Sequence, residues 1–344
     1  MKEFFNEIRF FLTKMANSFI DKSNSAVKIG EFLGHEDEIR VIIFSQDCSF
    51  VYSGGWDNKI LRWKLPKSDH IKEDTNRHIH TAESFIGHNG SITNLYLTND
   101  GQFLFSSSKD GTIKVWNTIN KKCIRSFNQN GKIYALCLDK SEKNLIAAGE
   151  NCLIKFYRIE RNMHKNREKR DIEIIEAHHT SMKTSSSIHV LKINEEGDLL
   201  ASSGDENLIY LWSFPEGKFK NCLTGHNKFV YSIDFHPTLP ILASGGKEKS
   251  LYLWNLKKNS ILKRIKVPAS ISHLRFSQDG NLLLTSDFKN NVRILDWKNG
   301  GSLQKIHFDK GKKLTIGLSD DWELFGMVPF ATRPMKIYLW SFDY

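Results

Sequence analysis

Several features that would place a protein in a simple class are missing from this chain of 344 residues. It has only five cysteines, and the absence of any CxxC pair argues against a zinc finger and against a disulfide scaffold. No apolar run reaches the roughly 18 residues that a membrane-spanning helix needs. The sequence also contains neither a Walker-type phosphate loop nor a GxSxG nucleophile elbow. Enzyme activity is therefore not predicted.

What is present is a globular composition with a basic balance. Hydrophobic residues make up 40% of the chain and charged residues 26%, which is typical of a folded protein. Forty-nine Lys and Arg against 39 Asp and Glu give a net charge of +10, which would suit an acidic partner or nucleic acid. These charges are spread along the chain. The cysteine usage indicates a reducing compartment, so we expect a cytoplasmic or nuclear location.

Two motifs recur at a fixed distance and divide the chain into repeats. Three Gly-His dipeptides are each followed by a tryptophan 28 residues after the histidine: His35 and Trp63, His88 and Trp116, His226 and Trp254. Short strand-like runs separated by turns lie between the two motifs. Four further units close at Tyr157, Trp212, Leu295 and Trp340. The sequence therefore contains seven repeat units.

Two more columns accompany the closing residues. A Ser or Thr lies ten residues before the closing position in most units, and an Asp or Glu lies six residues before it in most units. This pattern resembles the WD40-repeat family over about residues 28–344. The resemblance implies an all-β fold, a seven-bladed propeller of four-stranded blades. The Trp-Asp dipeptide that names the family is absent from every closing position, so the resemblance depends on the aligned columns and their spacing.

The resemblance also gives these columns a structural role. In the family, one His, Ser/Thr, Asp and Trp of a blade form a buried hydrogen-bonded chain. Carried over by position, the expected sets are His35–Ser53–Asp57–Trp63, His88–Ser106–Asp110–Trp116, Ser202–Glu206–Trp212 and His226–Ser244–Glu248–Trp254. Because one set serves each blade, we expect these residues to stabilise the blades rather than to form a catalytic or metal centre.

Function is therefore expected at the surface. We predict a non-enzymatic scaffold for protein–protein interactions, with no cofactor and no metal, that acts as a monomeric propeller within a larger complex. Two alternatives stay open. The net charge favours a subunit of a ribonucleoprotein or chromatin complex, although nucleic acid is the less favoured partner. Trp254-Asn255-Leu256-Lys257 weakly resembles a motif of ubiquitin-ligase substrate receptors.

The binding site is predicted on the face that carries the histidine loops. In the family, the residue before each acidic column points to solvent at the mouth of the ring, and Phe229 follows His226 on the same face. The expected partner-binding residues alternate between basic and aromatic types: Trp56, Lys109, Phe229, Lys247, Phe288 and Arg333. Glu150 and Asp205 occupy the same column on the opposite arc. Such a site would take a peptide or loop with acidic and apolar residues.

The chain outside the repeats is predicted to form a separate N-terminal element. Residues 1–26 are expected to be an amphipathic helix and linker, and residues 27–344 the propeller. The helix is predicted from apolar residues on one face: Phe4, Ile8, Phe11, Met15 and Phe19. Its apolar face requires a cover, either the propeller itself or another chain. Binding to a membrane surface and a targeting presequence are less favoured.

Three insertions and one spare strand complete the prediction. Pro66–Thr81, the basic Arg158–Asp171 and the Ser-rich Thr180–Ser187 are expected to be loops, the second a solvated loop or a contact for an acidic or nucleic-acid partner. Val27–Phe32 is expected to supply the last blade with its outer strand next to Lys336–Trp340. Such pairing would close the ring and hide its sheet edges.

Overall fold

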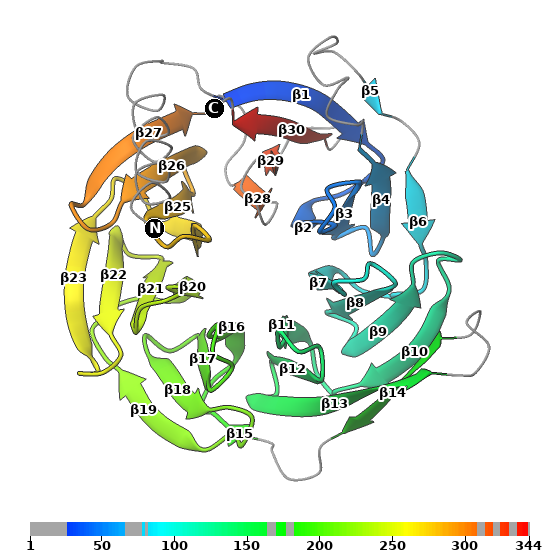
Figure 1. Cartoon of the computed structure of the whole chain (residues 1–344), viewed down its shortest axis with the longest axis horizontal. Coiled ribbons are helices and arrows are strands. Elements are labelled where there is room, and N and C mark those ends of the chain that lie inside the picture. Colours follow the sequence, from blue (N-terminus) through cyan, green and yellow to red (C-terminus); the bar gives the residue numbers. More distant parts are fainter. Residues whose placement is uncertain are drawn as a thin grey trace, which may run out of the picture.

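The chain folds into a ring of β-sheets around a central channel (Figure 1). The computed structural model describes residues 26–65, 78–79, 82–163, 170–176, 182–307, 314–318, 324–329 and 336–342. The regular structure in these ranges is entirely β, so the predicted all-β propeller is confirmed. The predicted N-terminal helix and the linker up to residue 25 lie outside the described residues. Within the described ranges no helix is long and apolar enough to cross a membrane.

The strands form seven sheets, numbered here as blades one to seven by the order of their inner strands. The inner strands are β2 (Ile39–Phe44), β7 (Ile92–Leu97), β11 (Ile133–Leu138), β16 (Ile188–Ile193), β20 (Val230–Phe235), β24 (Ile271–Phe276) and β28 (Leu314–Leu318). The second strands are β3 (Phe50–Gly55), β8 (Phe103–Ser108), β12 (Asn144–Gly149), β17 (Leu199–Gly204), β21 (Ile241–Gly246), β25 (Leu282–Asp287) and β29 (Leu324–Pro329).

The outer half of each blade contains the third and fourth strands. The third strands are β4 (Ile60–Lys64), β9 (Thr112–Asn117), β13 (Leu153–Met163), β18 (Ile209–Ser213), β22 (Ser250–Asn255), β26 (Asn291–Asp296) and β30 (Lys336–Phe342). The outer strands are β6 (Glu83–Phe85), β10 (Cys123–Asn128), β14 (Arg170–Glu176), β19 (Phe219–Leu223), β23 (Ser260–Lys266), β27 (Gly301–His307) and β1 (Ala26–Leu33). Two short strands add to this pattern: β5 (His78–Ile79) and β15 (Met182–Lys183).

Blade seven differs from the other six blades because it combines both ends of the described chain. In blades one to six the strands follow one another in chain order, whereas blade seven is ordered β28-β29-β30-β1. Strand β1 runs antiparallel to β30 from Ala26 opposite Phe342 to Leu33 opposite Lys336. The predicted closure by an N-terminal strand is therefore confirmed. The sequence did not indicate β5, which pairs in parallel with β1 at the outer edge.

The blades pack closely because their second strands are buried on both sides. Strands β8 and β21 are buried along their whole length, as expected for the middle of a packed sheet. Glycine is required where two blades approach most closely. A Cβ on Gly54 would lie 2.4 Å from Ile92 of the next blade, and one on Gly245 would lie 2.7 Å from Ile271.

The basic insertion after blade three extends a hairpin. Strands β13 and β14 pair from Tyr157 opposite Glu176 to Met163 opposite Arg170. The Arg161 guanidinium forms ion pairs with Asp100, at 3.0 Å, and with Glu142. The prediction of a loop is therefore wrong for the described part of the insertion, because both of its ends continue the sheet.

A β-bulge recurs near the start of the inner strands. In blades one to six the register shifts at the second residue of the inner strand. A bulge re-aims the side chain that it carries. The six bulge residues all line the central channel: Arg40, Thr93, Tyr134, His189, Tyr231 and Ser272. The wall of the channel is therefore set by a feature of strand pairing.

Candidate functional site

The two faces of the ring are defined by chain direction. The loops that carry His35, His88 and His226 come directly before the inner strands β2, β7 and β20. The turns that join third to outer strands, such as the one that contains Ile119, lie at the other end because consecutive strands are antiparallel. We call the first end the histidine face and the second the turn face.

Blade two brings together all four residues of its predicted hydrogen-bonded set. His88 Nδ1 lies 2.8 Å from the Asp110 carboxylate, and His88 Nε2 lies 2.7 Å from Ser106 Oγ. The Trp116 indole donates to the same hydroxyl at 2.8 Å. Burial raises the pKa of Asp110, but hydrogen bonds from His88, Thr112 and two backbone amides outweigh it, and the pKa lies well below its usual range.

Blade five builds the same chain with a longer acid. His226 Nδ1 bonds to Glu248, its Nε2 lies 2.6 Å from Ser244 Oγ, and Trp254 donates to that hydroxyl at 2.7 Å. The second Glu248 oxygen accepts from the Tyr252 hydroxyl at 3.1 Å. Burial lowers the pKa of His226, and Glu248 opposes the shift. Glutamate thus adds a tyrosine to the buried chain.

Blade one differs from its predicted set at one contact. His35 reaches Asp57 at 2.8 Å and Ser53 at 2.7 Å, as in blade two. Trp63, however, donates to the Leu33 carbonyl at 3.4 Å instead of to Ser53. The prediction of a complete set is therefore wrong for Trp63, because β1 places an acceptor beside its indole.

In blade four a serine contacts the acid. Trp212 donates to Ser202 at 2.9 Å, as predicted. Glu206 accepts from the Ser185 hydroxyl and from the Tyr210 hydroxyl. Ser185 belongs to the Ser-rich insertion, for which sequence favoured mobility. That prediction is wrong for residues 184–187, because Thr184 is buried and bonds to Cys152 and Ser186.

Blades three and six carry polar cores that the sequence did not reveal. In blade three the Gln129 amide donates to Tyr157 at 3.1 Å, so Gln129 rather than the neighbouring Asn130 reaches the closing residue. In blade six Arg293 and Asp287 form an ion pair, and their relative exposures are only 7% and 2%. No three His, Cys, Asp or Glu side chains of the described residues gather closely enough to hold a metal ion.

The predicted partner-binding residues of blades one and two form a pair on the histidine face. Trp56 remains 39% exposed although it sits in a tight turn between β3 and β4. The Lys109 ammonium lies 5.0 Å from the centre of its ring, a cation–π geometry. Burial lowers the pKa of Lys109, and the positive charges of Arg40 and Lys132 lower it further against the opposing charge of Glu38.

Blade five repeats this arrangement across the ring. Phe229 is 38% exposed, and the Lys247 ammonium lies 5.5 Å from its ring centre. Phe288 is partly buried and packs on Tyr231 with ring centres 5.4 Å apart. Arg333 lies outside the described residues. The structure thus places two separate aromatic–lysine pairs on the face, with Phe288 beside the second.

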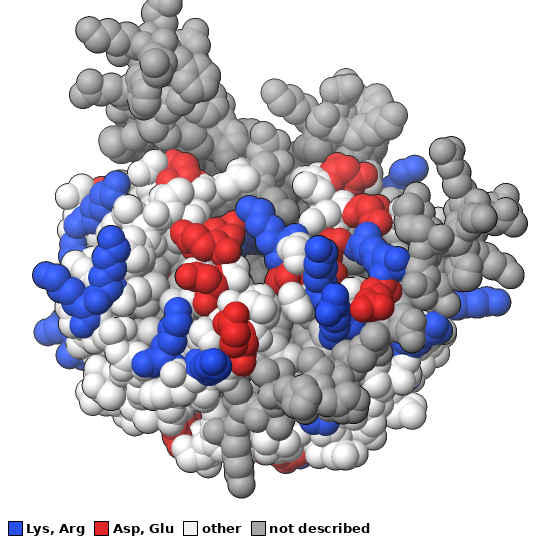
Figure 2. All heavy atoms as spheres, turned by 60° about the horizontal axis from the view of Figure 1, so that its bottom comes forward, with Lys and Arg blue, Asp and Glu red and all other residues white. Residues whose placement is uncertain are grey.

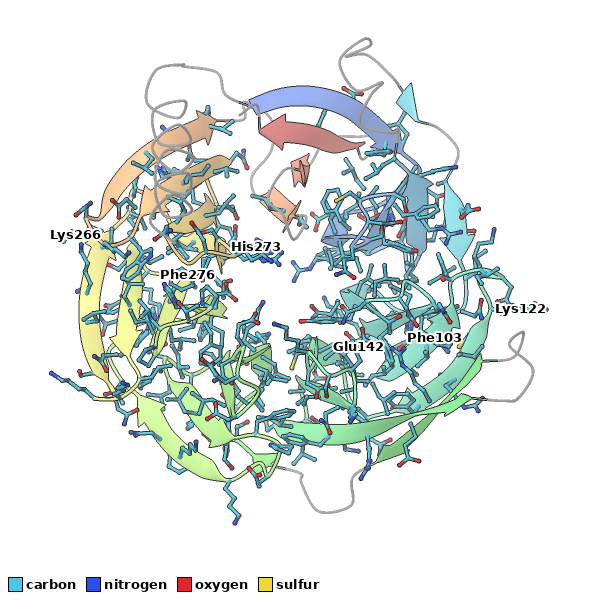
Figure 3. All side chains as sticks on the ribbon, in the orientation of Figure 1. Phe103, Lys122, Glu142, Lys266, His273 and Phe276 are labelled. Carbon is cyan, nitrogen blue, oxygen red and sulfur yellow. The ribbon has the colours of Figure 1, made fainter. Side chains whose placement is uncertain are left out.

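Both pairs border the central channel, which encloses about 700 Å³. Lys109, Phe229 and Phe288 contribute to its lining. Figure 3 shows the His273 side chain directed from β24 toward the middle of the ring, whereas Lys122 and Lys266 lie at the outer rim. A cavity of this size is within the range of ligand-binding pockets, about 300–1,000 Å³.

A basic flank lies away from this face. Figure 2 shows Lys and Arg side chains gathered on the left of the ring, the side on which β23 lies in Figure 1. The residues in and around β23 are largely exposed: Lys257, Lys258, Lys263, Arg264 and Lys266. The positive charge is thus not confined to the channel mouth.

Radial four-stranded sheets, with a buried His–Ser–acid–Trp chain in the regular blades, define a β-propeller of the repeat type. A family model, "WD domain, G-beta repeat", matches residues 26–64, 79–117, 217–255 and 260–296. These ranges correspond to four of the repeat units found in the sequence. The chain belongs to the WD40-repeat family.

Curated relatives are WD-repeat proteins of diverse name. The chain is 25% identical over 234 residues to the "Periodic tryptophan protein 2 homolog" of Dictyostelium discoideum, an alignment that covers 65% of this chain and 24% of the relative. It is 27% identical over 182 residues to the "Ribosome biogenesis protein BOP1 homolog" of Oryza sativa subsp. japonica, over 52% of this chain and 24% of the relative. It is 30% identical over 125 residues to the "Small ribosomal subunit protein RACK1" of Neurospora crassa, over 36% of each. The chain therefore spans about a quarter to a third of the length of these relatives.

Proposed function

We propose that this protein is a non-enzymatic scaffold that binds protein partners on the histidine face. The observation that carries this proposal is the pair of exposed aromatic–lysine contacts, Trp56 with Lys109 and Phe229 with Lys247, at the border of one channel. Aromatic residues that stay exposed on a rigid frame are typical anchors of an interface. The lysines beside them favour acidic groups in the partner.

The buried sets support the scaffold role rather than catalysis. Each histidine contacts an acid and a serine of its own blade, and all three histidines are at most 6% exposed. They cannot meet one substrate together. Their hydrogen bonds instead fix the loops that carry the exposed aromatics, because Gly55 and Trp56 separate Ser53 from Asp57 by only two positions.

The preferred partner is a peptide or loop that has apolar residues next to acidic ones. The propeller would bind it as one monomeric subunit of a complex, in the cytoplasm or nucleus. Relatives named for a ribosomal subunit and for ribosome biogenesis make a ribonucleoprotein complex the second candidate, and the basic flank around β23 favours it. Strongly salt-dependent retention of this protein on RNA would support that second candidate.

Replacing both exposed aromatics should remove the main partner without unfolding the ring. We choose Trp56→Ala with Phe229→Ala, since Phe288 is partly buried and its loss would also affect packing. Each aromatic anchor is worth about 2 kcal/mol or more at an interface, so affinity should fall by at least about a hundredfold. The measurement is partner capture from cells by the tagged full chain, together with the melting temperature.

The matched control is Ile119→Ala, which removes an 80% exposed side chain from the turn face. It should leave both partner capture and melting temperature unchanged. The histidine face is the wrong surface if the double variant keeps its partners while the control loses them.

A further inference from the structure

The central channel has an excess of positive charge in its wall. The described residues that line it include four cationic side chains and one carboxylate: Arg40, Lys109, Lys192, Arg275 and Asp205. Asp205 is already paired with His189, 2.7 Å away, on the same wall. The channel therefore has no free carboxylate of its own among these lining residues to balance the cations.

Arg40 is the least compensated of these cations. The bulge in β2 turns this residue into the channel wall, where it is partly buried. Among the described residues, no hydrogen bond or ion pair reaches its guanidinium, and only the nearby charge of Glu38 favours its charged form. Lys109, whose recorded contact is the Trp56 ring, feels the Arg40 charge as a repulsion. Two cations thus crowd one side of the channel mouth.

A second cationic layer lies deeper. Tyr96, Lys192, Asp234 and Arg275 each occupy the fifth position of an inner strand, three residues below the bulge. The Lys192 ammonium lies 3.4 Å from Asp234, whose other oxygen accepts from the Phe276 amide at 2.8 Å. Asp234 does not line the channel, so Lys192 and Arg275 present positive charge to the cavity.

Hydrogen-bond donors connect the two layers. Tyr134 and Tyr231 occupy bulge positions, and His273 follows the bulge in β24. Burial raises the pKa of both tyrosines, which keeps their hydroxyls protonated as donors at neutral pH. Figure 3 shows His273 aimed at the middle of the channel.

We propose that the channel is a binding site for a small molecule with several phosphate groups. Arg40 would hold one phosphate near the mouth, since guanidinium matches phosphate oxygens in a bidentate way. Arg275 and Lys192 would attract a second phosphate in the deeper layer. Cations at two depths favour a compact polyanion over the acidic side chain of a protein partner, which would reach only the upper layer. This site is separate from the protein contacts proposed for Trp56 and Phe229.

The test is isothermal titration of the full chain with inositol hexakisphosphate at about 0.15 M ionic strength, where surface attraction is screened. The natural chain should bind one molecule per propeller. Arg40→Gln removes a charge-assisted contact and should weaken binding by at least about tenfold. Tricarballylate, a carboxylate polyanion, should bind at least about tenfold more weakly than the phosphate probe, because its carboxylates match fewer donors.

Two matched variants make the result decisive. Arg158→Gln removes the same charge from the outside of blade three, where the side chain is 70% exposed, and should bind the probe like the natural chain. Trp56→Ala with Phe229→Ala should also keep the probe, which separates this site from the proposed partner surface. The proposal is overturned if the natural chain does not bind the probe, if Arg40→Gln binds it unchanged, or if Arg158→Gln weakens it equally. Loss of protein partners in Arg40→Gln without any binding of the probe would assign the cations to an acidic protein segment instead.

Discussion

A chain that begins at Gly34 should not form a closed ring. The deletion removes β1, which pairs with β30 at seven positions from Ala26 to Leu33. It also removes Phe32, which is 1% exposed and packs on Trp63 with ring centres 5.7 Å apart. The indole of Trp63 would lose its acceptor on Leu33 as well. We expect unfolded or oligomeric protein, because β30 would become an unpaired edge strand.

The measurement is size-exclusion chromatography with near-ultraviolet circular dichroism of two deletions. Removal of residues 1–33 should yield aggregates or lose the aromatic signal, whereas removal of residues 1–22 keeps β1 and should leave a monomer with an unchanged melting temperature. A monomeric, cooperatively melting chain that starts at Gly34 would show that β1 does not close the ring.

The buried ion pair of blade six gives the second large effect. Arg293→Met should destabilise the protein by about 3–5 kcal/mol, the usual cost when one partner of a buried pair is removed. The loss arises because Asp287 would keep its charge at 2% exposure without the guanidinium. Arg158→Met, at an exposed ion pair with Glu160, should cost no more than about 1 kcal/mol. Urea denaturation at pH 7 measures both variants.

The pH dependence of this variant follows from Asp287. Burial raises the pKa of Asp287, but hydrogen bonds from Arg293, Asn291 and backbone amides outweigh burial and lower it overall. A carboxylate with a depressed folded-state pKa stabilises the protein above its ordinary pKa of about 4, and this stability is lost as the pH falls through the folded value. The difference between the natural chain and Arg293→Met should therefore narrow below about pH 4.

A double variant separates the lost charge partner from a lost packing contact. Asp287→Asn with Arg293→Met removes both charges, so it should be more stable than Arg293→Met alone at pH 7. If Arg293→Met stays within about 1 kcal/mol of the natural chain, the pair does not carry the stability assigned to it.

The repeat columns predicted much of the propeller because their chemistry is local. A histidine, a serine and a tryptophan at fixed spacing meet wherever three neighbouring strands are antiparallel, as His88, Ser106 and Trp116 do. The spare strand was predictable for the same reason, since a repeat count leaves one blade short of an outer strand. These contacts depend on spacing within one unit, and spacing is visible in a sequence.

Contacts that come from outside the unit were not predictable. Ser185 reaches Glu206 from an insertion whose path no repeat column records, and Leu33 takes the indole of Trp63 from a strand at the other side of the ring closure. Arg40 lines the channel because a bulge shifts the register of β2, and bulges leave no signature in side-chain alternation. The same bulge in six blades shows that the channel wall is a property of strand pairing rather than of any motif.

Lysine crosslinking of the native complex, followed by mass spectrometry, tests the central claim most directly. Lys59, Lys132 and Lys247 belong to loops on the histidine face, whereas Lys122, Lys140 and Lys257 belong to turns on the opposite face. If partners bind the histidine face, crosslinks to partner proteins should concentrate on the first three lysines and should disappear in Trp56→Ala with Phe229→Ala. Partner crosslinks that concentrate on Lys122, Lys140 and Lys257, and persist in that double variant, would contradict the account.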